Sequence, residues 1–331
     1  MSTTETTTET ITYKDGINRG LADAMEADDS VCLFGEDVAA AGGAFKLTEG
    51  LLERFGPNRV RDTPISEQAI IGTAIGAALS GLRPVAEIMF ADFAAVCFDG
   101  IANEMAKYRY MTGGQVTMPA TVRMSNGAAG FAAQHSQSVE NWFLNVSGLK
   151  IVVPSTAADA YGLIRAAIED PDPVLYFEHK GLFNRKEELA GELTVGQIGK
   201  ADVVRAGSDV TVVASQLMRH RALEAAEALA GEGVDVEVID PLTLVPFDVA
   251  TVGESIDKTN HLVIAQESTH DGSWGATLVA RLMAERFEAL DAPPLIVGGD
   301  ETPIPYAGPL EDLWVPSAER IADGVRKTLA F

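Results

Sequence analysis

The chain has 331 residues, 47% of them hydrophobic, and 48 acidic residues outnumber 25 basic ones to give a formal net charge of −23. The length predicts two domains with ordinary hydrophobic cores. The negative charge repels phosphate backbones and anionic lipid surfaces, so nucleic acid and membrane partners are not expected. The two cysteines, Cys32 and Cys97, lie in apolar runs and are too few for a disulfide scaffold. This usage indicates a reducing compartment, and we expect a cytoplasmic protein.

The first twelve residues are mostly Thr and Glu and are predicted to form a disordered tail. The chain has neither the basic and apolar regions of a signal peptide nor a run of eighteen apolar residues, so no membrane span is expected. Helical spacing of apolar residues follows over 13–26. Strands are then predicted at 31–35, 83–89, 120–124, 150–154, 174–177, 210–215, 234–240, 262–266 and 295–297. Helices are predicted among them at 67–80, 159–169, 218–229 and 273–287.

Most of these strand-like runs are apolar throughout, which is typical of parallel strands covered by helices on both faces. The pattern therefore predicts an α/β fold of three-layer domains with mostly parallel sheets. The alternation stops once, in a polar stretch between about residues 181 and 207, and a new α/β unit starts at Asp209. We therefore place a domain boundary near residue 195, with a first domain at 13–195 and a second at 196–331.

Glu67 stands at the beginning of an almost wholly apolar helix of small residues, which Ser66 can cap. One interpretation is structural: the carboxylate favours the positive end of the helix dipole. The other is functional: a partly buried carboxylate forms a hydrogen bond to a basic ring nitrogen, because no basic residue lies nearby in the sequence. Both interpretations stay open at this point.

Met89 and Phe93 follow a predicted strand, at the end where parallel α/β sheets bind ligands. They are candidates for an apolar wall against a flat ring, although core packing is the alternative. A helix is expected over 99–110, with an aromatic and basic end that suits an interface.

His135 lies in a loop of small residues, 126–137, with hydrogen-bonding neighbours. It is the strongest of the five histidines for acid/base chemistry, with a structural role as the alternative. The other four histidines are expected to pack or cap. The spacing of the loop glycines matches neither a P-loop nor a dinucleotide fingerprint. No His or Cys pair has metal-ligand spacing and no nucleophile elbow is present, so a zinc site and a hydrolase triad are not predicted.

Taken together, six motifs resemble the β subunit of the thiamine-diphosphate-dependent decarboxylating component of 2-oxo acid dehydrogenase complexes, of pyruvate, acetoin and branched-chain types. The likeness covers 13–331, and its motifs are Gly35–Val38, Ile65–Gly81, Ala106–Tyr110, Gln134–Gln137, Gly148–Ser155 and Thr302–Tyr306. The resemblance implies a pyrimidine-binding domain followed by a transketolase C-terminal domain. It also implies a heterotetramer of two α and two β chains, in which the α chain holds the cofactor's diphosphate and Mg²⁺. The chain itself has only a late Gly298-Gly299-Asp300, which does not match that motif.

By resemblance, Glu67 would contact N1′ of the aminopyrimidine and activate the cofactor. Phe93 would stack on that ring, while Ile65 and Met89 would line it. His135 would face the reactive centre and act as an acid when the acyl group passes to a lipoyl-lysine. Gly100 and a short loop at 127–133 depart from the family pattern and leave the substrate class open.

The resemblance also implies a structural monovalent cation, usually potassium. The positions that match its ligands are Ala120, Ala167, Ile168, Asp170 and Asp172. In the second domain, a lipoyl acyltransferase core with a basic subunit-binding domain is the expected partner. It would meet an acidic C-terminal end formed by Asp300, Glu301, Glu311, Asp312 and the terminal carboxylate.

Two other functions are consistent with these residues. The chain could be a subunit of a two-chain transketolase-like enzyme that transfers a ketol unit without a lipoyl partner, and Glu67 does not discriminate between the two enzymes. It could instead be a subunit without turnover that only completes an oligomer, which the presence of both Glu67 and His135 disfavours. We therefore expect an oxidoreductase β subunit that is active only with its α subunit.

Overall fold

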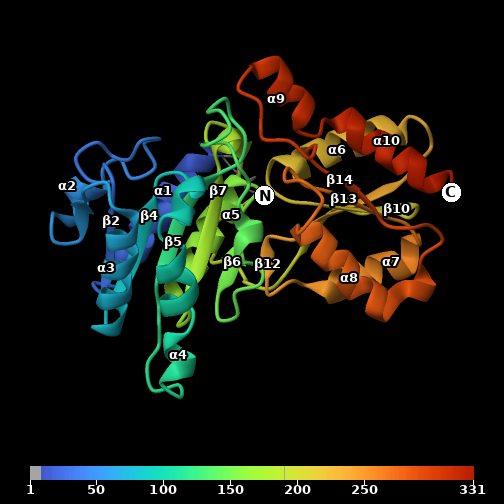
Figure 1. The fold of residues 1–331 in the computed structure, drawn as a ribbon. Helices are drawn as coiled ribbons and strands as arrows, with labels where there is room; N and C mark the ends of the chain where they lie inside the picture. Colours follow the sequence, from blue (N-terminus) through green and yellow to red (C-terminus); the bar gives the residue numbers. More distant parts are fainter. Residues whose placement is uncertain (1–8, 190) are drawn as a thin grey trace, which may run out of the picture.

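The computed structural model describes residues 9–189 and 191–331, which form two α/β units side by side (Figure 1). The first unit is built on a seven-stranded sheet with the strand order β12-β6-β7-β5-β4-β2-β3. Its strands are parallel except for β12, which runs antiparallel to β6. They are β2 (Val31–Gly35), β3 (Val60–Asp62), β4 (Arg83–Ile88), β5 (Thr121–Asn126), β6 (Lys150–Val152), β7 (Val174–His179) and β12 (Thr243–Val245).

Helices cover both faces of this sheet, as the apolar runs predicted. On one face, α1 (Tyr13–Ala27) and α5 (Ala157–Glu169) pack on each other and on the strands. On the other face lie α3 (Glu67–Leu79), η1 (Ala91–Ala95) and η2 (Gly100–Met105). Shorter segments complete the unit: α2 (Leu51–Phe55), α4 (Tyr108–Met111), η3 (Glu140–Phe143) and η4 (Lys180–Leu182).

The second unit has a five-stranded sheet with the order β14-β13-β10-β11-β9, in which only β9 is antiparallel to its neighbour. Its strands are β9 (Asp202–Arg205), β10 (Val210–Ala214), β11 (Val236–Asp240), β13 (Leu262–Ala265) and β14 (Leu295–Val297). One face is covered by α6 (Leu217–Ala230) and α10 (Ala318–Leu329), and the other by α7 (Val249–Thr259) and α8 (Trp274–Arg286). The segments η5 (Phe287–Ala289) and α9 (Gly308–Trp314) lie outside these layers. The predicted three-layer α/β architecture is therefore confirmed in both units.

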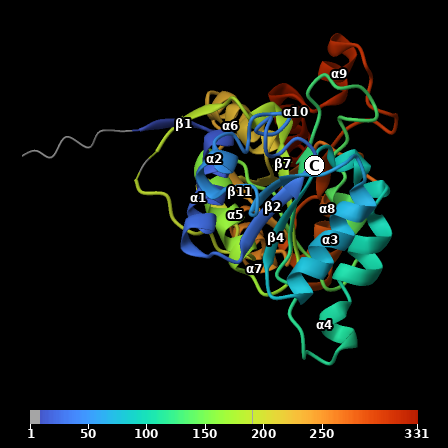
Figure 2. The same ribbon diagram turned by 90° about the vertical axis from the view of Figure 1, so that its left-hand side faces the viewer.

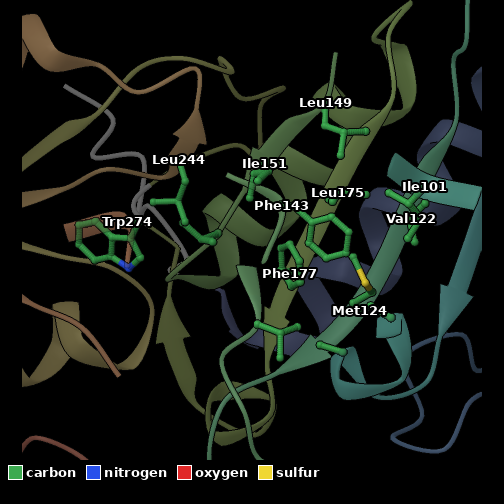
Figure 3. Packing of buried hydrophobic residues seen from close by; sticks show 14 of the residues in the cluster. Ile101, Val122, Met124, Phe143, Leu149, Ile151, Leu175, Phe177, Leu244 and Trp274 are labelled. Atoms are coloured by element: carbon green, nitrogen blue, oxygen red, sulfur yellow. The ribbon is translucent and has the colours of Figure 1, made fainter. Parts of the chain in front are cut away.

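One hydrophobic core joins the two units. It contains residues of β5 and β7, such as Val122 and Leu175, together with Leu244 beside β6 and Trp274 of α8 (Figure 3). All four side chains are at least 97% buried. Because this core crosses from one sheet to the layer of the other, the second unit supports the first directly.

Three local predictions differ from the structure. Thr10–Thr12 is not a disordered tail but the strand β1, antiparallel to β8 (Lys186–Glu188); residues 1–8 lie outside the described part of the chain. The helix expected over 99–110 is a π-helical turn, η2, followed by the short α4. Beyond the predicted boundary, β12 returns to the first sheet, so the chain crosses between the two units more than once.

Among the residues described, none of the helices combines the length and the apolar character that crossing a bilayer requires.

Candidate functional site

The candidate residues meet at the carboxyl ends of four neighbouring parallel strands. Glu36 follows β2, Glu67 follows β3, Met89 follows β4, and the loop with His135 follows β5. These strands are adjacent in the order β5-β4-β2-β3. Ligands of parallel α/β sheets bind at this edge, so the fold alone brings together residues that are up to 100 positions apart.

Glu67 is the first residue of α3, and its side chain is only 8% exposed. The residues that follow on the buried face of this helix, including Ile70, Ile71 and Ala74, pack into the shared core. A carboxylate at a helix N-terminus is stabilised by the backbone dipoles there, so an acidic side chain can lie in these apolar surroundings. The position of Glu67 is thus compatible with a structural role, in which its carboxylate stabilises the start of α3.

Burial, together with the negative charge of Glu67, raises the pKa of two neighbouring titratable groups, Glu36 and Cys97. Burial raises the pKa of the Glu36 carboxyl, and the negative charge of Glu67 raises it further. Burial and the same charge raise the pKa of the Cys97 thiol to about 12. The site therefore gathers two carboxyl groups and a thiol, and burial favours the protonated forms of Glu36 and Cys97.

The other face of α3 is open. Gly72 and Gly76 are exposed, and a Cβ atom built on either of them would meet nothing within 4 Å. Ile65, two residues before Glu67, is 83% exposed. The apolar residue nearest to Glu67 in sequence therefore lies on an uncovered surface.

Aromatic rings form the wall opposite this helix. The imidazole of His135 lies edge-on to Phe93, with ring centroids 5.3 Å apart, and edge-on to Phe90 at 4.8 Å. Met89 and Phe93 are half-buried, so both present part of their surface to the site. Edge-to-face contacts of this kind fix the plane of a ring. Of the predicted residues, the structure brings Phe93 and His135 into direct contact.

Below the wall, buried charges are paired across the sheet. Arg123 in β5 donates to Glu87 in β4 at 2.7 Å and to Glu178 in β7 at 3.0 Å. Burial raises the pKa of Glu87 to about 7, against the opposing effect of the Arg123 charge. Lys180, just after β7, is also buried, and burial lowers the pKa of its ammonium to about 8. These groups hold the strand ends in register beneath the site.

The predicted potassium ligands gather at the opposite edge of the sheet, near the amino ends of β5 and β7. The carbonyl oxygen of Ala120 accepts the backbone N–H of Val174 at 3.0 Å. Ala167 is a buried residue in the last turns of α5. Within the described ranges, no cluster of three or more His, Cys, Asp or Glu side chains is arranged to hold a metal ion.

Two protein cations, Arg83 and Lys150, already bind the oxygens of Ile168 and Asp170 in this predicted set. The guanidinium of Arg83 donates to the carbonyls of Ile168 at 2.8 Å and Asp170 at 3.2 Å. The ammonium of Lys150 donates to both carboxylate oxygens of Asp170, at 2.7 and 2.6 Å, and lies 3.6 Å from Asp172. A further cation would be repelled by both, so the residues as arranged do not fit a bound potassium ion.

Four residues of the site escaped the sequence prediction. Glu36 follows β2 at the same edge as Glu67 and lies within the motif Gly35–Val38. Phe90 and Asp92 lie between the predicted pair Met89 and Phe93 in the sequence; Asp92 Oδ1 accepts from the side-chain amide of Gln137 at 2.8 Å. Lys180 gave no signal, because its burial depends on packing from the second unit.

The comparisons with known proteins agree with this geometry. Models described as "Transketolase, pyrimidine binding domain" and "Transketolase, C-terminal domain" match residues 9–186 and 199–321. "Pyruvate dehydrogenase E1 component subunit beta" of Rhizobium meliloti is 42% identical over 96% of this chain and 69% of its own length. "Acetoin:2,6-dichlorophenolindophenol oxidoreductase subunit beta" of Bacillus subtilis is 45% identical, over 94% and 95%. "3-methyl-2-oxobutanoate dehydrogenase subunit beta" of Mycobacterium tuberculosis is 44% identical, over 97% and 93%.

The chain belongs to the family of 2-oxo acid dehydrogenase E1 β subunits. The names of these relatives favour that family over the transketolase-like alternative. A solved structure, "Split gene transketolase, inactive beta4 tetramer", aligns with a TM-score of 0.81 over 97% of this chain and 98% of that chain, at 24% identity. It shows that this E1 β subunit has the transketolase fold.

Proposed function

We propose that this E1 β subunit works with a separate α chain to cleave a 2-oxo acid or an acetoin-type substrate, using thiamine diphosphate, and to pass the acyl group to a lipoyl domain. The observation that carries the proposal is Glu67, a buried acid at the N-terminus of an apolar helix, in a chain whose relatives include β subunits of pyruvate and 3-methyl-2-oxobutanoate dehydrogenases. An oxidoreductase activity that requires both chains follows from this assignment.

The residues at the sheet edge fit the pyrimidine end of the cofactor. Glu67 would hold a proton between its carboxylate and N1′ of the ring, from a buried position at the start of α3. Phe93 and Met89 would pack on the ring, and Ile65 would close over it from the exposed side. When bound, thiamine diphosphate supplies a nucleophilic carbon and an electron sink for decarboxylation.

The diphosphate end fits a partner chain better than this one. The Gly298-Gly299-Asp300 segment is a packing site: a Cβ on Gly299 would lie 2.5 Å from the Trp314 ring, and one on Gly298 would lie 2.7 Å from the Ser268 carbonyl oxygen. Glycine is needed there for close approach to protein atoms, not to phosphate. We therefore assign the diphosphate and its Mg²⁺ to the α chain.

His135 would act at the transfer step. When the lipoyl disulfide opens, one sulfur bonds the acyl carbon and the other must take up a proton. An imidazolium at His135, fixed against Phe90 and Phe93, would donate that proton.

The open face of α3 fits an α-chain helix. Small residues let two helix backbones approach closely, and Gly72 and Gly76 lie four residues apart with free space above them. Exposed apolar side chains continue this surface at Ile65, Leu79 and Val96. A partner helix there would cover Ile65 and complete the pocket around Glu67. We propose the arrangement of two α and two β chains that the sequence predicts.

A reconstitution experiment tests the proposal. The β chain, an E1 α chain from the same genome, and their mixture are each assayed with thiamine diphosphate and Mg²⁺ on pyruvate, 3-methyl-2-oxobutanoate and acetoin. Decarboxylation or cleavage is followed with an artificial electron acceptor, and acyl transfer with a free lipoyl domain. We expect activity only in the mixture. Full activity of the β chain alone would overturn the division of the site between two chains.

A further inference from the structure

The loop that carries His135 is closed at its base within the first unit. The backbone N–H of Gly127 donates to the carbonyl of Gln137 at 3.2 Å, which ties the two ends of the loop together. The backbone N–H of Gln137 also donates to Asp92 at 3.3 Å, beside Phe93. The base therefore needs no help from the second unit.

The far part of the loop, by contrast, is held by two carboxylates of the second unit. The backbone N–H of Ala128 donates to Glu267, which follows β13. The backbone N–H of Gly130 donates to both oxygens of Glu311 in α9, at 2.9 and 3.2 Å. The loop, green in Figures 1 and 2, lies beside the red α9 in both views. It thus spans the gap between the two units.

The Glu267 contact belongs to the packed core. Glu267 lies 2.6 Å from Nε2 of His179, whose Nδ1 accepts the N–H of Gly181 at 3.1 Å. Since Nδ1 is an acceptor, the hydrogen of His179 is on Nε2 and is donated to Glu267. A Cβ on Gly127 would lie 2.2 Å from that ring. Replacing Glu267 would therefore disturb the core as well as the loop.

Glu311, unlike Glu267, contacts the loop from outside the packed core. Its side chain is 9% exposed and comes from a helix at the surface, outside the two sheet layers. It was predicted to belong to an acidic docking face, and that prediction is wrong for this residue, because its carboxylate is directed at Gly130. The Glu311 carboxylate therefore binds the loop that carries His135 and does not face a basic partner.

The segment between Gly130 and His135 needs such support. Ala132 has a φ of +64°, a left-handed conformation that a residue with a Cβ rarely adopts. It is followed by a hydrogen bond from the His135 N–H to the Ala132 carbonyl at 3.2 Å. The orientation of His135 thus depends directly on a strained residue. Strained turns keep their shape only when the surrounding structure holds them.

We propose that Glu311 is a positioning residue for His135: by binding the N–H of Gly130 from the second unit, it keeps the loop in the conformation that directs the imidazole to the acyl-transfer position. This inference rests on the proposed function of His135. It makes the second unit a determinant of acyl transfer and not only a support for the subunit interface. Decarboxylation, which depends on Glu67 and not on this loop, is not controlled by Glu311.

The test uses the assembled complex with its α chain, thiamine diphosphate and a free lipoyl domain. Three variants are compared: Glu311→Ala, which removes both acceptor oxygens; Glu311→Gln, which keeps one acceptor without the charge; and Glu227→Ala, which removes an exposed acid of α6 in the same unit. Two rates are measured, acylation of the lipoyl domain and decarboxylation with an artificial acceptor. Amide hydrogen exchange is followed in a peptide that covers residues 128–134.

We expect Glu311→Ala to lower lipoyl acylation about tenfold or more, because hydrogen bonds to charged groups are among the stronger ones, while decarboxylation changes less than about twofold. Exchange in the loop peptide should accelerate by a similar factor. Glu311→Gln, which keeps an acceptor but loses the charge, should slow transfer and loosen the loop less than Glu311→Ala does but measurably, and Glu227→Ala should match the wild type in both rates.

Two outcomes would overturn the inference. One is an equal loss of both rates in Glu311→Ala; the other is an unchanged transfer rate with unchanged loop exchange. If Glu311→Ala fails to assemble, Glu311→Gln decides, since a slower transfer with intact decarboxylation and faster loop exchange supports the role and wild-type values in all three overturn it. Failure of the proposed function itself is distinct, because the wild-type complex would then acylate no lipoyl domain at all.

Discussion

The imidazole of His135 lies edge-on to the ring of Phe93, with centroids 5.3 Å apart and an angle of 82° between the planes. One residue comes from the loop after β5 and the other from η1 after β4, so the contact joins the His135 loop to the predicted cofactor wall. Edge-to-face aromatic pairs contribute about 0.5–1.5 kcal/mol beyond the area they bury. This contact orients His135, which would be a second role for Phe93 besides the cofactor packing proposed for it.

Replacing Phe93 by Leu tests this second role. Leu keeps an apolar surface for the cofactor but loses the ring edge, so we expect the rate of lipoyl acylation to fall about three- to tenfold, as the lost contact energy allows. Cofactor affinity should fall less. The matched control is Phe98→Leu, which removes an aromatic ring stacked on Phe143, 5.1 Å away, instead of on His135. If Phe98→Leu slows transfer as strongly as Phe93→Leu, the effect is one of packing alone.

His135→Ala should separate the two half-reactions. Loss of a positioned general acid slows proton transfer by about 10²–10⁴-fold, so acylation of a lipoyl domain should fall by that order. Decarboxylation read with an artificial acceptor needs no proton at the lipoyl sulfur and should fall much less. His270→Ala, which removes an exposed loop histidine of the second unit, serves as the control. Equal losses in the two assays would argue against a transfer role for His135.

Glu67→Gln should abolish turnover while the fold persists. Gln keeps the size of the side chain and can still pack at the start of α3, but it cannot hold a proton for N1′, so we expect a loss of at least about 100-fold in decarboxylation. Thermal unfolding and assembly with the α chain should stay close to wild type. An exposed acid in the first turn of α2, Glu53, gives the control Glu53→Gln. Normal turnover of Glu67→Gln would remove this residue from the mechanism.

The sequence predicted the α/β architecture because buried parallel strands are apolar along their whole length, and it located most strands to within two residues. It also predicted that Met89 lies at the end of a strand and that the His135 loop follows one, whereas β3, the short strand before Glu67, was not predicted; parallel pairing places all three at one edge. The irregular η2 was missed, since its composition is that of an ordinary helix. Whether a helix or a π-turn forms there depends on close packing, such as that of Gly100 on Ile71.

Long-range polar contacts were beyond the sequence. Glu311 stood in an acidic segment and was predicted to face solvent, because nothing near it in the chain indicates that its partner is the N–H of Gly130, 181 residues away. The same holds for Arg83, whose guanidinium reaches the carbonyl of Ile168. Backbone donors and acceptors carry no side-chain signature, so only the fold shows which charged side chain binds them.

The pairing of Arg83 and Lys150 with the predicted potassium ligands leads to a prediction about salts. An ion whose free concentration is 100 times its dissociation constant stabilises a protein by about 2.7 kcal/mol, which raises the unfolding temperature by about 5 °C or more. Because the two side chains already take the oxygen ligands, exchanging K⁺ for Na⁺ or tetramethylammonium at constant ionic strength should shift that temperature by less than about 1 °C. A selective rise of several degrees in K⁺ would show that an ion displaces these side chains.

The contribution of Lys180 to the free energy of unfolding should rise at alkaline pH. Burial lowers the pKa of its ammonium to about 8 in the folded chain, against about 10.4 in an unfolded one. Between these two pKa values the unfolded state binds more protons than the folded state. The contribution of Lys180 to the free energy of unfolding therefore rises with pH, by up to about 3 kcal/mol. Below pH 8 the ammonium stays charged in the fold, so the full cost of burying it remains. The carboxylates of Asp92, Glu267, Glu178 and Glu311 oppose this shift without cancelling it.

Urea unfolding of wild type and Lys180→Met at several pH values between 7 and 10.5 measures this contribution. The difference in the free energy of unfolding, wild type minus variant, should increase steadily from pH 8 to 10 and stay flat below pH 8. Comparing differences removes the other groups that titrate in this range, and Lys186→Met, at an exposed position in β8, should give a difference that does not depend on pH. A flat difference for Lys180→Met would mean that its ammonium stays as well solvated in the fold as in the unfolded chain.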